Sequence, residues 1–466
     1  MTELRDVLAK TLDHAATYRE AVATDTKLHR SYHEMRERVA SPLPEQGADS
    51  AAVIDELVAL AEGGLMPTVG PRFFAWVMGA SHPAGVAADW LVSAWGQNAG
   101  YHATAPAAAA FEEVAEAWLL DLLDLPRQGG IGFSTGATVA NGTCLAAART
   151  ATLLKAGWDP DADGLFGAPP VHVLLGADAH SSVFAALQLI GFGSKRVVSI
   201  ATDAQGRMLP SALEAAIKPL SGPKIVIAQA GQINTGDFDP FAEIATIAKA
   251  HDAWVHVDGA FGLWARATPA LKHLTDGIDA FDSWVTDGHK WLQVPYDCGF
   301  AIVRDKAILN RAMTQWSSYL PTTAQGDRVP ANYVPELSRR ARGIPVWALI
   351  KAYGRDGIAE LVDGNCRLAR RFAERLAAEP GVRVLNEVVL NQFVVSFGSG
   401  DAAARKAATE AVIAAVLEDG TCFVNGANWR GDWAMRVSVS SAPTTEGDID
   451  MSADAIIAAW RKVQGH

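Results

Sequence analysis

The sequence predicts an α/β protein with a mainly parallel sheet, followed by a smaller α+β domain and preceded by a helical arm. Short apolar runs alternate with helical segments through the middle of the chain, a pattern typical of a parallel sheet covered on both faces. At 466 residues the chain is too long for one compact core. We expect an arm at residues 1–65, a large domain at 66–343 and a small domain at 344–466.

The arm reads as amphipathic helices interrupted by the turn-forming segment SPLPEQGADS at residues 41–50. It has little core of its own, so we expect it to pack on another surface. In the large domain, five apolar runs are predicted strands. They are VHVLLGA (171–177), KIVIAQAG (224–231), AWVHVDGA (253–260), SWVTDGH (283–289) and GFAIVRD (299–305).

The pattern changes near residue 344. A long helical segment occupies residues 345–380, and strand-like alternation returns in VRVLNEV (382–388), QFVVSFG (392–398) and AMRVSVSS (434–441). These strands predict a small domain with a partly antiparallel sheet.

Composition excludes several classes of protein. The chain has 52 acidic and 40 basic residues, a net charge of -12 and no run of Lys and Arg, so nucleic-acid binding is not expected. Neither a secretory signal nor an apolar stretch of about 18 residues is found, so we expect no membrane span. The four cysteines are far apart without a CxxC pair, which favours a reduced cytoplasmic protein without a disulfide framework or a metal site.

Ligands of open α/β sheets bind at the carboxyl ends of strands, so the polar residues there are informative. In GFSTGATVAN (132–141), small and hydroxyl residues at 134–138 precede a helix. The helix N–H groups and the Thr138 hydroxyl could hold a phosphate, although an ordinary helix cap is the commoner explanation. The segment is not a dinucleotide fingerprint, because Gly136 falls one residue late, and it lacks the lysine of a P-loop.

Three further strand ends carry a histidine, an aspartate and a lysine. His180 follows a strand in GADAHSSV, where a capping or packing role is usual. Asp258 precedes the small residues Gly259 and Ala260, which leave room for a flat ring, and a buried carboxylate there requires a cation. Lys290 lies in a strongly apolar and aromatic segment, where a less hydrated amine is a better nucleophile unless its tip reaches water.

Each of these features alone has an ordinary explanation, but one ligand uses all four. Pyridoxal 5′-phosphate carries a phosphate, a flat ring, a basic pyridine nitrogen and an aldehyde that forms a Schiff base with lysine. The set therefore predicts a pyridoxal-phosphate site.

Together the motifs resemble those of the group II pyridoxal-phosphate-dependent amino-acid decarboxylases, which include the aromatic-L-amino-acid, glutamate, histidine and diaminobutyrate enzymes. The resemblance runs from about Arg72 to the C-terminus. It rests on STGATVAN, AHSSV, HVDGAFG, HKWL and LSRRARGIPVW, in that order. It implies the type I, aspartate-aminotransferase-like fold, with a seven-stranded-type sheet, and a homodimer with shared active sites.

The resemblance also implies roles for single residues. Lys290 would be the Schiff-base lysine, and Asp258 would keep the pyridine nitrogen protonated. His180 and Ala260 would lie on the two ring faces, while Tyr319, assisted by His180, would protonate the substrate α-carbon. The remaining implied cofactor contacts are Ala137, Thr138 and His289 at the phosphate, and Asn234 at the ring oxygen.

Two departures from the family pattern bear on this reading. Gly231, Gln232 and Ile233 stand where many members have Gly-Thr-Thr, which is why Asn234 is our candidate for the ring oxygen. The loop between Tyr319 and Arg339 is shorter than in the aromatic-amino-acid enzymes.

The segments that meet the substrate side chain in this family are apolar here. Trp76, Val77, Met78 and Tyr101 predict a wall for an aromatic or bulky apolar L-amino acid, and Arg72 is the only nearby cation for an acidic side chain. A glutamate- or diaminobutyrate-type substrate is the alternative within the family.

Other activities remain as alternatives. Aldehyde-forming relatives commonly replace the loop tyrosine or the stacking histidine, and this chain keeps Tyr319 and His180. A type I aminotransferase or aldolase would share the cofactor site, and an aminotransferase could use Arg436 for the substrate carboxylate. A nicotinamide dehydrogenase is disfavoured by the failed glycine fingerprint.

Overall fold

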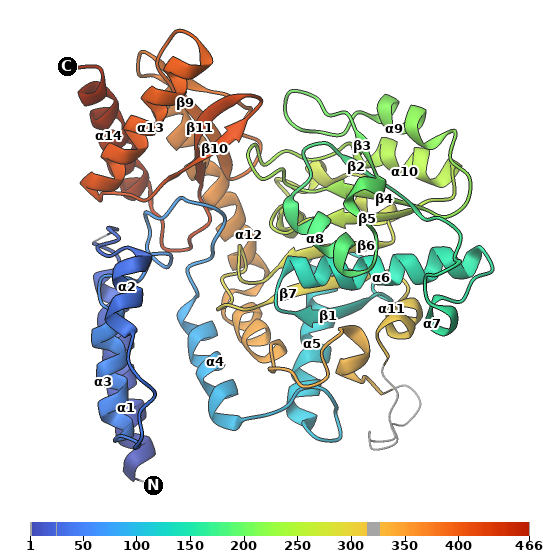
Figure 1. Cartoon of the computed structure of the whole chain (residues 1–466), viewed down its shortest axis with the longest axis horizontal. Helices are drawn as coiled ribbons and strands as arrows, with labels where there is room; N and C mark the ends of the chain where they lie inside the picture. Colours follow the sequence, from blue (N-terminus) through green and yellow to red (C-terminus); the bar gives the residue numbers. More distant parts are fainter. Residues whose placement is uncertain (1, 25, 315–326, 466) are drawn as a thin grey trace. The chain divides into compact units, whose positions relative to one another are not determined.

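The computed structural model describes residues 2–24, 26–314 and 327–465. The chain forms two compact units (Figure 1). One unit contains Met1–Ala80, Arg371–Val384 and Val395–His466, and the other contains Ser81–Arg370 and Leu385–Val394. The domain boundaries at residues 65 and 343 stay a prediction.

The unit around Ser81–Arg370 is built on a seven-stranded sheet. Its strands are β1 (Gly130–Ser134), β2 (His172–Gly176), β3 (Val197–Ile200), β4 (Lys224–Gln229), β5 (Trp254–Asp258), β6 (Ser283–Asp287) and β7 (Gly299–Val303). The strand order is β1-β7-β6-β5-β4-β2-β3. The pairs from β6 to β3 are parallel, whereas β7 is antiparallel to β6 and β1. The predicted mainly parallel sheet is confirmed, and the five predicted strands are β2 and β4 to β7.

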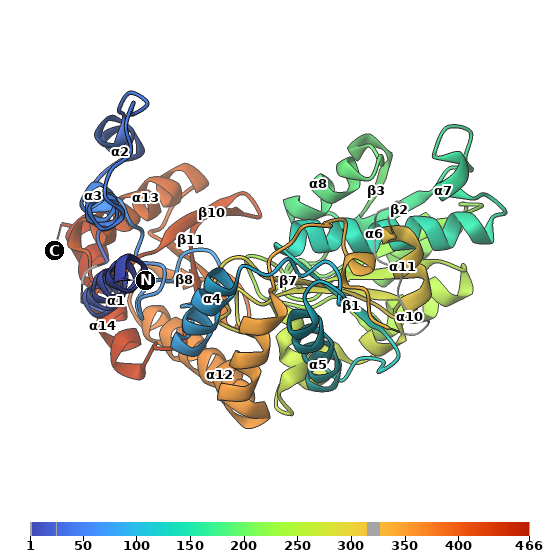
Figure 2. The same cartoon turned by 90° about the horizontal axis from the view of Figure 1, so that it is seen from below.

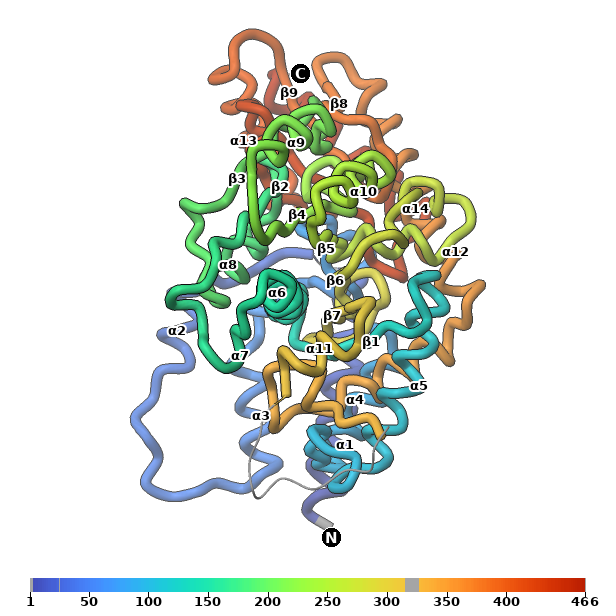
Figure 3. The backbone as a smooth tube through the Cα atoms, turned by 90° about the vertical axis from the view of Figure 1, so that its right-hand side faces the viewer, coloured from blue at the N-terminus to red at the C-terminus, as the bar shows by residue number. Residues whose placement is uncertain are grey.

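Helices cover this sheet on both faces (Figure 3). The helices of this unit are α4 (Pro83–Trp95), α5 (Pro106–Leu122), α6 (Ala137–Lys155), α7 (Pro160–Asp163), α8 (Ser181–Leu189), α9 (Pro210–Ile217), α10 (Phe241–Ala250) and α11 (Lys306–Met313). Short 3₁₀ turns are η1 (Ser194–Arg196), η2 (Gly262–Ala267), η3 (Lys272–Thr275), η4 (Ile278–Ala280) and η5 (Pro330–Tyr333).

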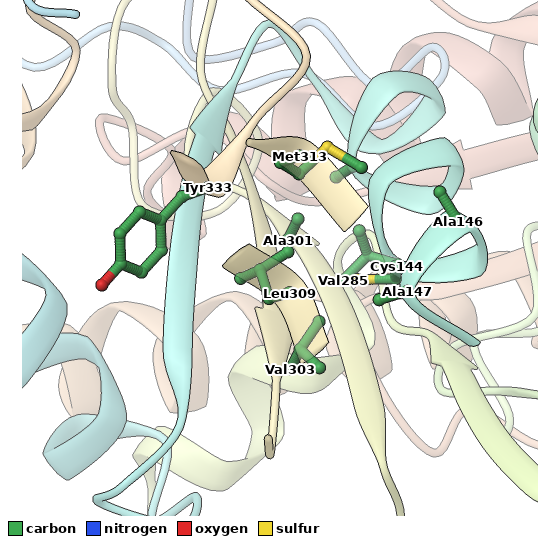
Figure 4. Packing of buried hydrophobic residues seen from close by; sticks show 10 residues of the cluster. Cys144, Ala146, Ala147, Val285, Ala301, Val303, Leu309, Met313 and Tyr333 are labelled. Carbon is green, nitrogen blue, oxygen red and sulfur yellow. The ribbon is translucent and has the colours of Figure 1, made fainter. Parts of the chain in front are cut away.

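Small side chains let α6 lie close to the sheet. Cys144 and Ala147 of α6 pack against Val285 of β6 and Ala301 of β7, and Met313 of α11 joins the same cluster (Figure 4). A second cluster joins α6 and α8 to β2 and β4. Burial of these apolar surfaces holds the N-terminus of α6 at the edge of the sheet.

Strand register brings chemically useful residues to one edge. Gln229 of β4 pairs with Asp258 of β5, and Asp258 pairs with Val285 of β6. Because these strands are parallel, their carboxyl ends and the loops that follow them meet at that edge. The segments predicted to carry chemistry begin there.

The other unit contains the N-terminal arm and a four-stranded sheet. Its elements are α1 (Thr2–Ala21), α2 (Tyr32–Val39), α3 (Ser50–Ala61), β8 (Val382–Val384), β9 (Gln392–Phe397), α13 (Ala402–Asp419), β10 (Asn425–Trp429), β11 (Asp432–Ser438) and α14 (Glu446–Val463). The sheet order is β10-β11-β9-β8, and β9 begins in the unit around Ser81–Arg370. Helix α13 packs on β11 and α14 (Figure 2). The predicted α+β pattern is confirmed.

The predicted long helix is α12 (Gly343–Ala377), which begins in one unit and ends in the other. Its helical course is broken at Gly354, where φ is 64° and ψ is 178°. Glycine tolerates this positive φ because it has no Cβ. The helix therefore consists of two segments.

Within the described residues, no helix is long and apolar enough to cross a membrane. The four cysteines, Cys144, Cys298, Cys366 and Cys422, are buried free thiols. No group of three or more His, Cys, Asp or Glu side chains in this part of the chain is arranged to hold a metal ion.

Candidate active site

A cavity of about 350 Å³ lies at the carboxyl edge of the seven-stranded sheet. Its wall is formed by the first turn of α6, the first turn of α8, and the ends of β4, β5 and β6 with the residues that follow them. Most of the predicted cofactor residues line it, namely Ala137, Thr138, His180, Asp258, Ala260, His289 and Lys290. Segments as far apart in the sequence as Thr135 and Tyr296 thus meet in one site.

Lys290 follows β6, and its neighbours Trp291, Leu292 and Val294 are buried. Trp291 anchors the segment by donating its indole N–H to Asn365 Oδ1 (2.9 Å). The ammonium group is not in an apolar setting, however. Its Nζ lies 3.1 Å from Asp287 Oδ2, and the two side chains are 18% and 3% exposed. Asp287, at the end of β6, was missed in the sequence although it precedes the lysine by three residues.

Asp258 is the last residue of β5 and is 5% exposed. One carboxylate oxygen accepts the Ala260 N–H (3.3 Å). Burial raises the pKa of Asp258, and the positive charges of His180 and Lys290 act in the opposite direction. An ionised carboxylate at this depth requires a cation, and a protonated pyridine nitrogen would supply one.

His180 caps helix α8 and also lines the cavity. Its Nδ1 accepts the Ser182 N–H (3.3 Å) and lies 2.7 Å from Ser182 Oγ. Because Nδ1 accepts the backbone hydrogen bond, the neutral imidazole carries its hydrogen on Nε2. The capping role and a role in the cavity are therefore compatible.

The N-terminus of α6 is open for an anion. Gly136 precedes the helix, and no side-chain hydrogen bond from the described residues caps it. Ala137, Thr138 and Val139 line the cavity, so the first-turn N–H groups and the helix dipole are available to a phosphate.

His289 lies beside this helix start. A Cβ built at Gly136 would lie 3.1 Å from its Cε1. The Cys298 N–H donates to its Nδ1 (3.2 Å), and its ring stacks on Tyr296 with the centroids 4.4 Å apart. Burial lowers the pKa of His289, so Nε2–H is the remaining donor.

The turn after β4 does not bring Asn234 to the cavity wall, which Gly231 and Ile233 line instead. The Asn234 N–H donates to Gln232 Oε1 (2.6 Å), which holds the turn together. Sequence reasoning also missed Gln229 and Tyr296, both of which line the cavity. Gln229 could have been found as the polar residue near the end of the predicted strand 224–231, since it ends β4.

The predicted substrate residues are distributed over both units. Trp76, Val77 and Met78 belong to the unit that contains the arm, where Trp76 stacks on Phe73 and Phe423. In that unit Arg72 donates to Thr421 O (2.6 Å) and pairs with Asp448 Oδ1 (3.1 Å).

The other residues with a predicted role in substrate binding or catalysis are Arg436, Tyr101 and Tyr319. Arg436 is buried in β11 in the arm-containing unit. Tyr101 follows α4 in the unit that holds the cavity. Tyr319 lies outside the described residues.

The fold and the cavity define a class of protein, the type I fold enzymes that hold pyridoxal 5′-phosphate through a lysine. The residues present fit this cofactor. They offer an uncapped helix N-terminus for the phosphate, a buried carboxylate for the ring nitrogen, and the Lys290 amine in the same cavity.

Comparison with known proteins gives the family. The model of the pyridoxal-dependent decarboxylase conserved domain matches residues 33–397. The chain belongs to this family, and it is a pyridoxal-phosphate-dependent L-amino-acid decarboxylase.

Individual relatives differ in the substrate that they are named for. The chain is 30% identical to an aromatic-L-amino-acid decarboxylase of Bacillus atrophaeus, over 72% of this chain and 69% of the relative. It is 32% identical to an L-2,4-diaminobutyrate decarboxylase of Rhizobium meliloti, over 69% and 64%. The fold is similar to that of Oryza sativa TDC, solved with PLP and tryptamine, with a TM-score of 0.92, 24% identity, and coverage of 99% and 98%.

Proposed function

We propose that the protein decarboxylates an aromatic or bulky apolar L-amino acid to the amine and carbon dioxide. The observation that supports the site assignment is the convergence of Lys290, Asp258, His180 and the start of α6 on one cavity. When bound, the cofactor supplies an electron sink for the bond that breaks at the substrate α-carbon.

Each side chain has one task in this proposal. Lys290 would hold the cofactor covalently through its side-chain amine. Asp258 keeps a proton on the ring nitrogen, because its buried carboxylate is stabilised by that charge. His180 and Ala260 cover the two ring faces.

The remaining tasks concern the phosphate and one proton. Ala137, Thr138 and His289 bind the phosphate, the last through Nε2–H. Tyr319, assisted by His180, delivers the proton to the α-carbon. Asn234 as the contact of the ring oxygen remains a prediction.

Two observations support an apolar substrate. One is the name of the Bacillus atrophaeus relative, an aromatic-L-amino-acid decarboxylase. The other is the state of Arg72, whose guanidinium is already hydrogen-bonded to Thr421 and Asp448 and so is not open to an acidic substrate side chain. The Rhizobium meliloti relative makes 2,4-diaminobutyrate the second candidate.

We further propose a homodimer in the cytoplasm. In the arm, α1 and α3 are tied together by the Glu3–Ser50 hydrogen bond (2.7 Å) and the His14–Asp55 contact (3.0 Å). The pair leaves a row of large apolar side chains exposed. They are Leu4, Leu8 and Leu12 of α1 and Val53 and Leu57 of α3. A second copy of the chain would bury this row.

The experiment that tests the proposed function is a screen of the purified, cofactor-loaded protein with single L-amino acids. Amine and carbon dioxide are measured together for tryptophan, tyrosine, phenylalanine, glutamate and 2,4-diaminobutyrate. Carbon dioxide from an aromatic substrate is expected. Release of a keto acid or an aldehyde instead of the amine would replace the proposal with an aminotransferase or an aldehyde-forming enzyme.

The lysine assignment has its own test. Lys290→Ala should abolish the yellow absorbance of the lysine–cofactor linkage, whereas Lys272→Ala, at an exposed lysine paired with Asp124, should keep it. A yellow Lys290→Ala protein would overturn the assignment.

A further inference from the structure

Asp287 has one carboxylate oxygen occupied and one without a hydrogen-bond partner. Oδ2 faces Lys290 Nζ at 3.1 Å and His289 Nε2 at 3.6 Å. Oδ1 is buried and accepts no hydrogen bond from any residue in the described part of the chain. A buried acceptor without a donor is unfavourable, so a group that fills the cavity is expected to meet Oδ1.

The position of Asp287 Oδ1 indicates which bound group would contact it. A Cβ built at Gly136 would lie 3.6 Å from it, and one built at Gly299 would lie 2.9 Å from it. Gly136 is the residue before the first turn of α6. Oδ1 is therefore beside the helix start where the proposed function places the cofactor phosphate.

Few charges surround this point. In the described part of the chain, the titratable groups around Asp287 include Lys290, His289, Tyr296, Cys298, Asp258 and His180, and Asp297 acts on His289 and Cys298. The first turn of α6 adds N–H groups but no charged side chain. Burial raises the pKa of Tyr296 to about 12 and that of the Cys298 thiol still further, and it lowers the pKa of His289. These three groups are therefore neutral near pH 7, and Lys290 is the cation that Asp287 contacts.

A phosphate ester brings up to two negative charges to this place. An ionised Asp287 would repel them at short range in a site of low dielectric constant. A neutral carboxyl group would instead donate a hydrogen bond to a phosphate oxygen.

We propose that Asp287 takes up a proton when a phosphate ester binds at the start of α6, and that its carboxyl group then donates a hydrogen bond to the phosphate. The proton comes from solvent, one for each phosphate bound, and no electron is transferred. Neutral Asp287 no longer pairs its charge with Lys290, so phosphate binding also weakens the hold of Asp287 on the amine. This inference rests on the proposed function, which places the phosphate at α6.

The test uses the full-length apoprotein and pyridoxine 5′-phosphate, which lacks the aldehyde and so cannot bond to Lys290. Titration calorimetry at pH 8 in two buffers of different ionisation enthalpy counts the protons taken up. The wild type should take up close to one proton, and its affinity should fall about tenfold per pH unit above pH 7. Asp287→Asn should take up about one proton fewer than the wild type, and its affinity should fall correspondingly less as the pH rises.

A matched control is Asp297→Asn. Asp297 lies in the loop that follows Asp287, but its carboxylate pairs with Arg342 Nε (2.9 Å) instead of lining the cavity. This variant should behave as the wild type. Equal proton uptake by the wild type and Asp287→Asn would overturn the inference.

A second readout locates the proton. The ³¹P chemical shift of the bound ester should be that of a dianion in the wild type, because the proton is on Asp287. A monoanion shift would overturn the inference, and this measurement decides even if Asp287→Asn does not fold. Failure of the ester to bind the wild type would instead overturn the proposed phosphate site.

Discussion

Gly299 packs so closely on Gly136 that a Cβ at residue 299 would lie 2.5 Å from the Gly136 Cα. Gly299 begins β7, and Gly136 immediately precedes α6. The antiparallel strand β7 thus sets the position of the helix start that faces the cavity. The contact leaves no room for any side chain at residue 299.

Gly299→Ala should therefore weaken both folding and cofactor binding. Overpacking of this kind typically costs about 1–3 kcal/mol, and relief of the clash would displace the first turn of α6. Chemical denaturation and titration with pyridoxal 5′-phosphate measure the two effects.

Gly142→Ala is the control for Gly299→Ala, because a Cβ at residue 142 meets nothing within 4 Å. It should add about 0.5–1 kcal/mol of stability and leave cofactor affinity unchanged, since it lies inside α6. Wild-type affinity in Gly299→Ala would contradict this view.

Asp258→Asn should leave the cofactor bound but reduce kcat by roughly 100- to 1000-fold, a typical loss for one preorganised electrostatic partner. The amide cannot balance a positive charge on the ring nitrogen. Steady-state carbon dioxide release measures the effect.

The control for Asp258 is Asp282→Asn. Asp282 is a second carboxylate whose pKa burial raises, and it accepts the Val255 N–H (2.8 Å) at the opposite end of β5. Its replacement should lower stability and leave kcat unchanged. If both variants lost activity equally, the assigned role of Asp258 would fail.

His256 should make the protein less stable in acid. Its ring is buried between Asn141 Oδ1 (2.7 Å) and Ser283 Oγ (2.9 Å), and burial lowers its pKa to about 3. The unfolded chain binds a proton near the ordinary value of 6.5 while the folded chain does not. Stability is therefore fully present above pH 6.5 and falls as the pH drops toward 3, by up to about 1.4 kcal/mol per pH unit.

His256→Gln should remove this part of the pH dependence. Denaturation at several pH values below 6.5 measures the slope, and His251→Gln, a partly exposed histidine near Glu214, should retain it. An unchanged slope in His256→Gln would show that other groups cause the acid sensitivity.

The exposed row on the arm predicts the oligomeric state. Leu8→Glu combined with Leu57→Glu places two charges in the row and should dissociate the proposed dimer, because a buried unpaired charge is strongly unfavourable. Sedimentation velocity measures the mass. Phe166→Glu, at another exposed apolar residue, should remain a dimer. A wild-type protein that sediments as an active monomer would refute the proposal.

The sequence alone predicted five of the seven strands of the large sheet and several of the residues that line the cavity. Strands β2 and β4 to β7 were predicted because apolar runs bounded by Gly and polar residues carry their own local signal. Asp258 and Lys290 were found because each follows such a run, and parallel strands place their ends at one edge. Residue order along the chain therefore determined the class of cofactor.

The contact between Lys290 and Asp287 is decided by the tertiary structure. The N–H groups of Gly288 and His289 donate to Cys298 O (3.0 and 3.2 Å), so the chain after β6 folds back against the start of β7. This loop closure brings the Lys290 amine to Asp287, a contact that no apolar pattern indicates. Likewise, the antiparallel insertion of β7 between β6 and β1 puts Gly299 against Gly136. Local patterns determine strands and helices because they depend on near neighbours, whereas charge pairing and close packing depend on residues that only the folded chain brings together.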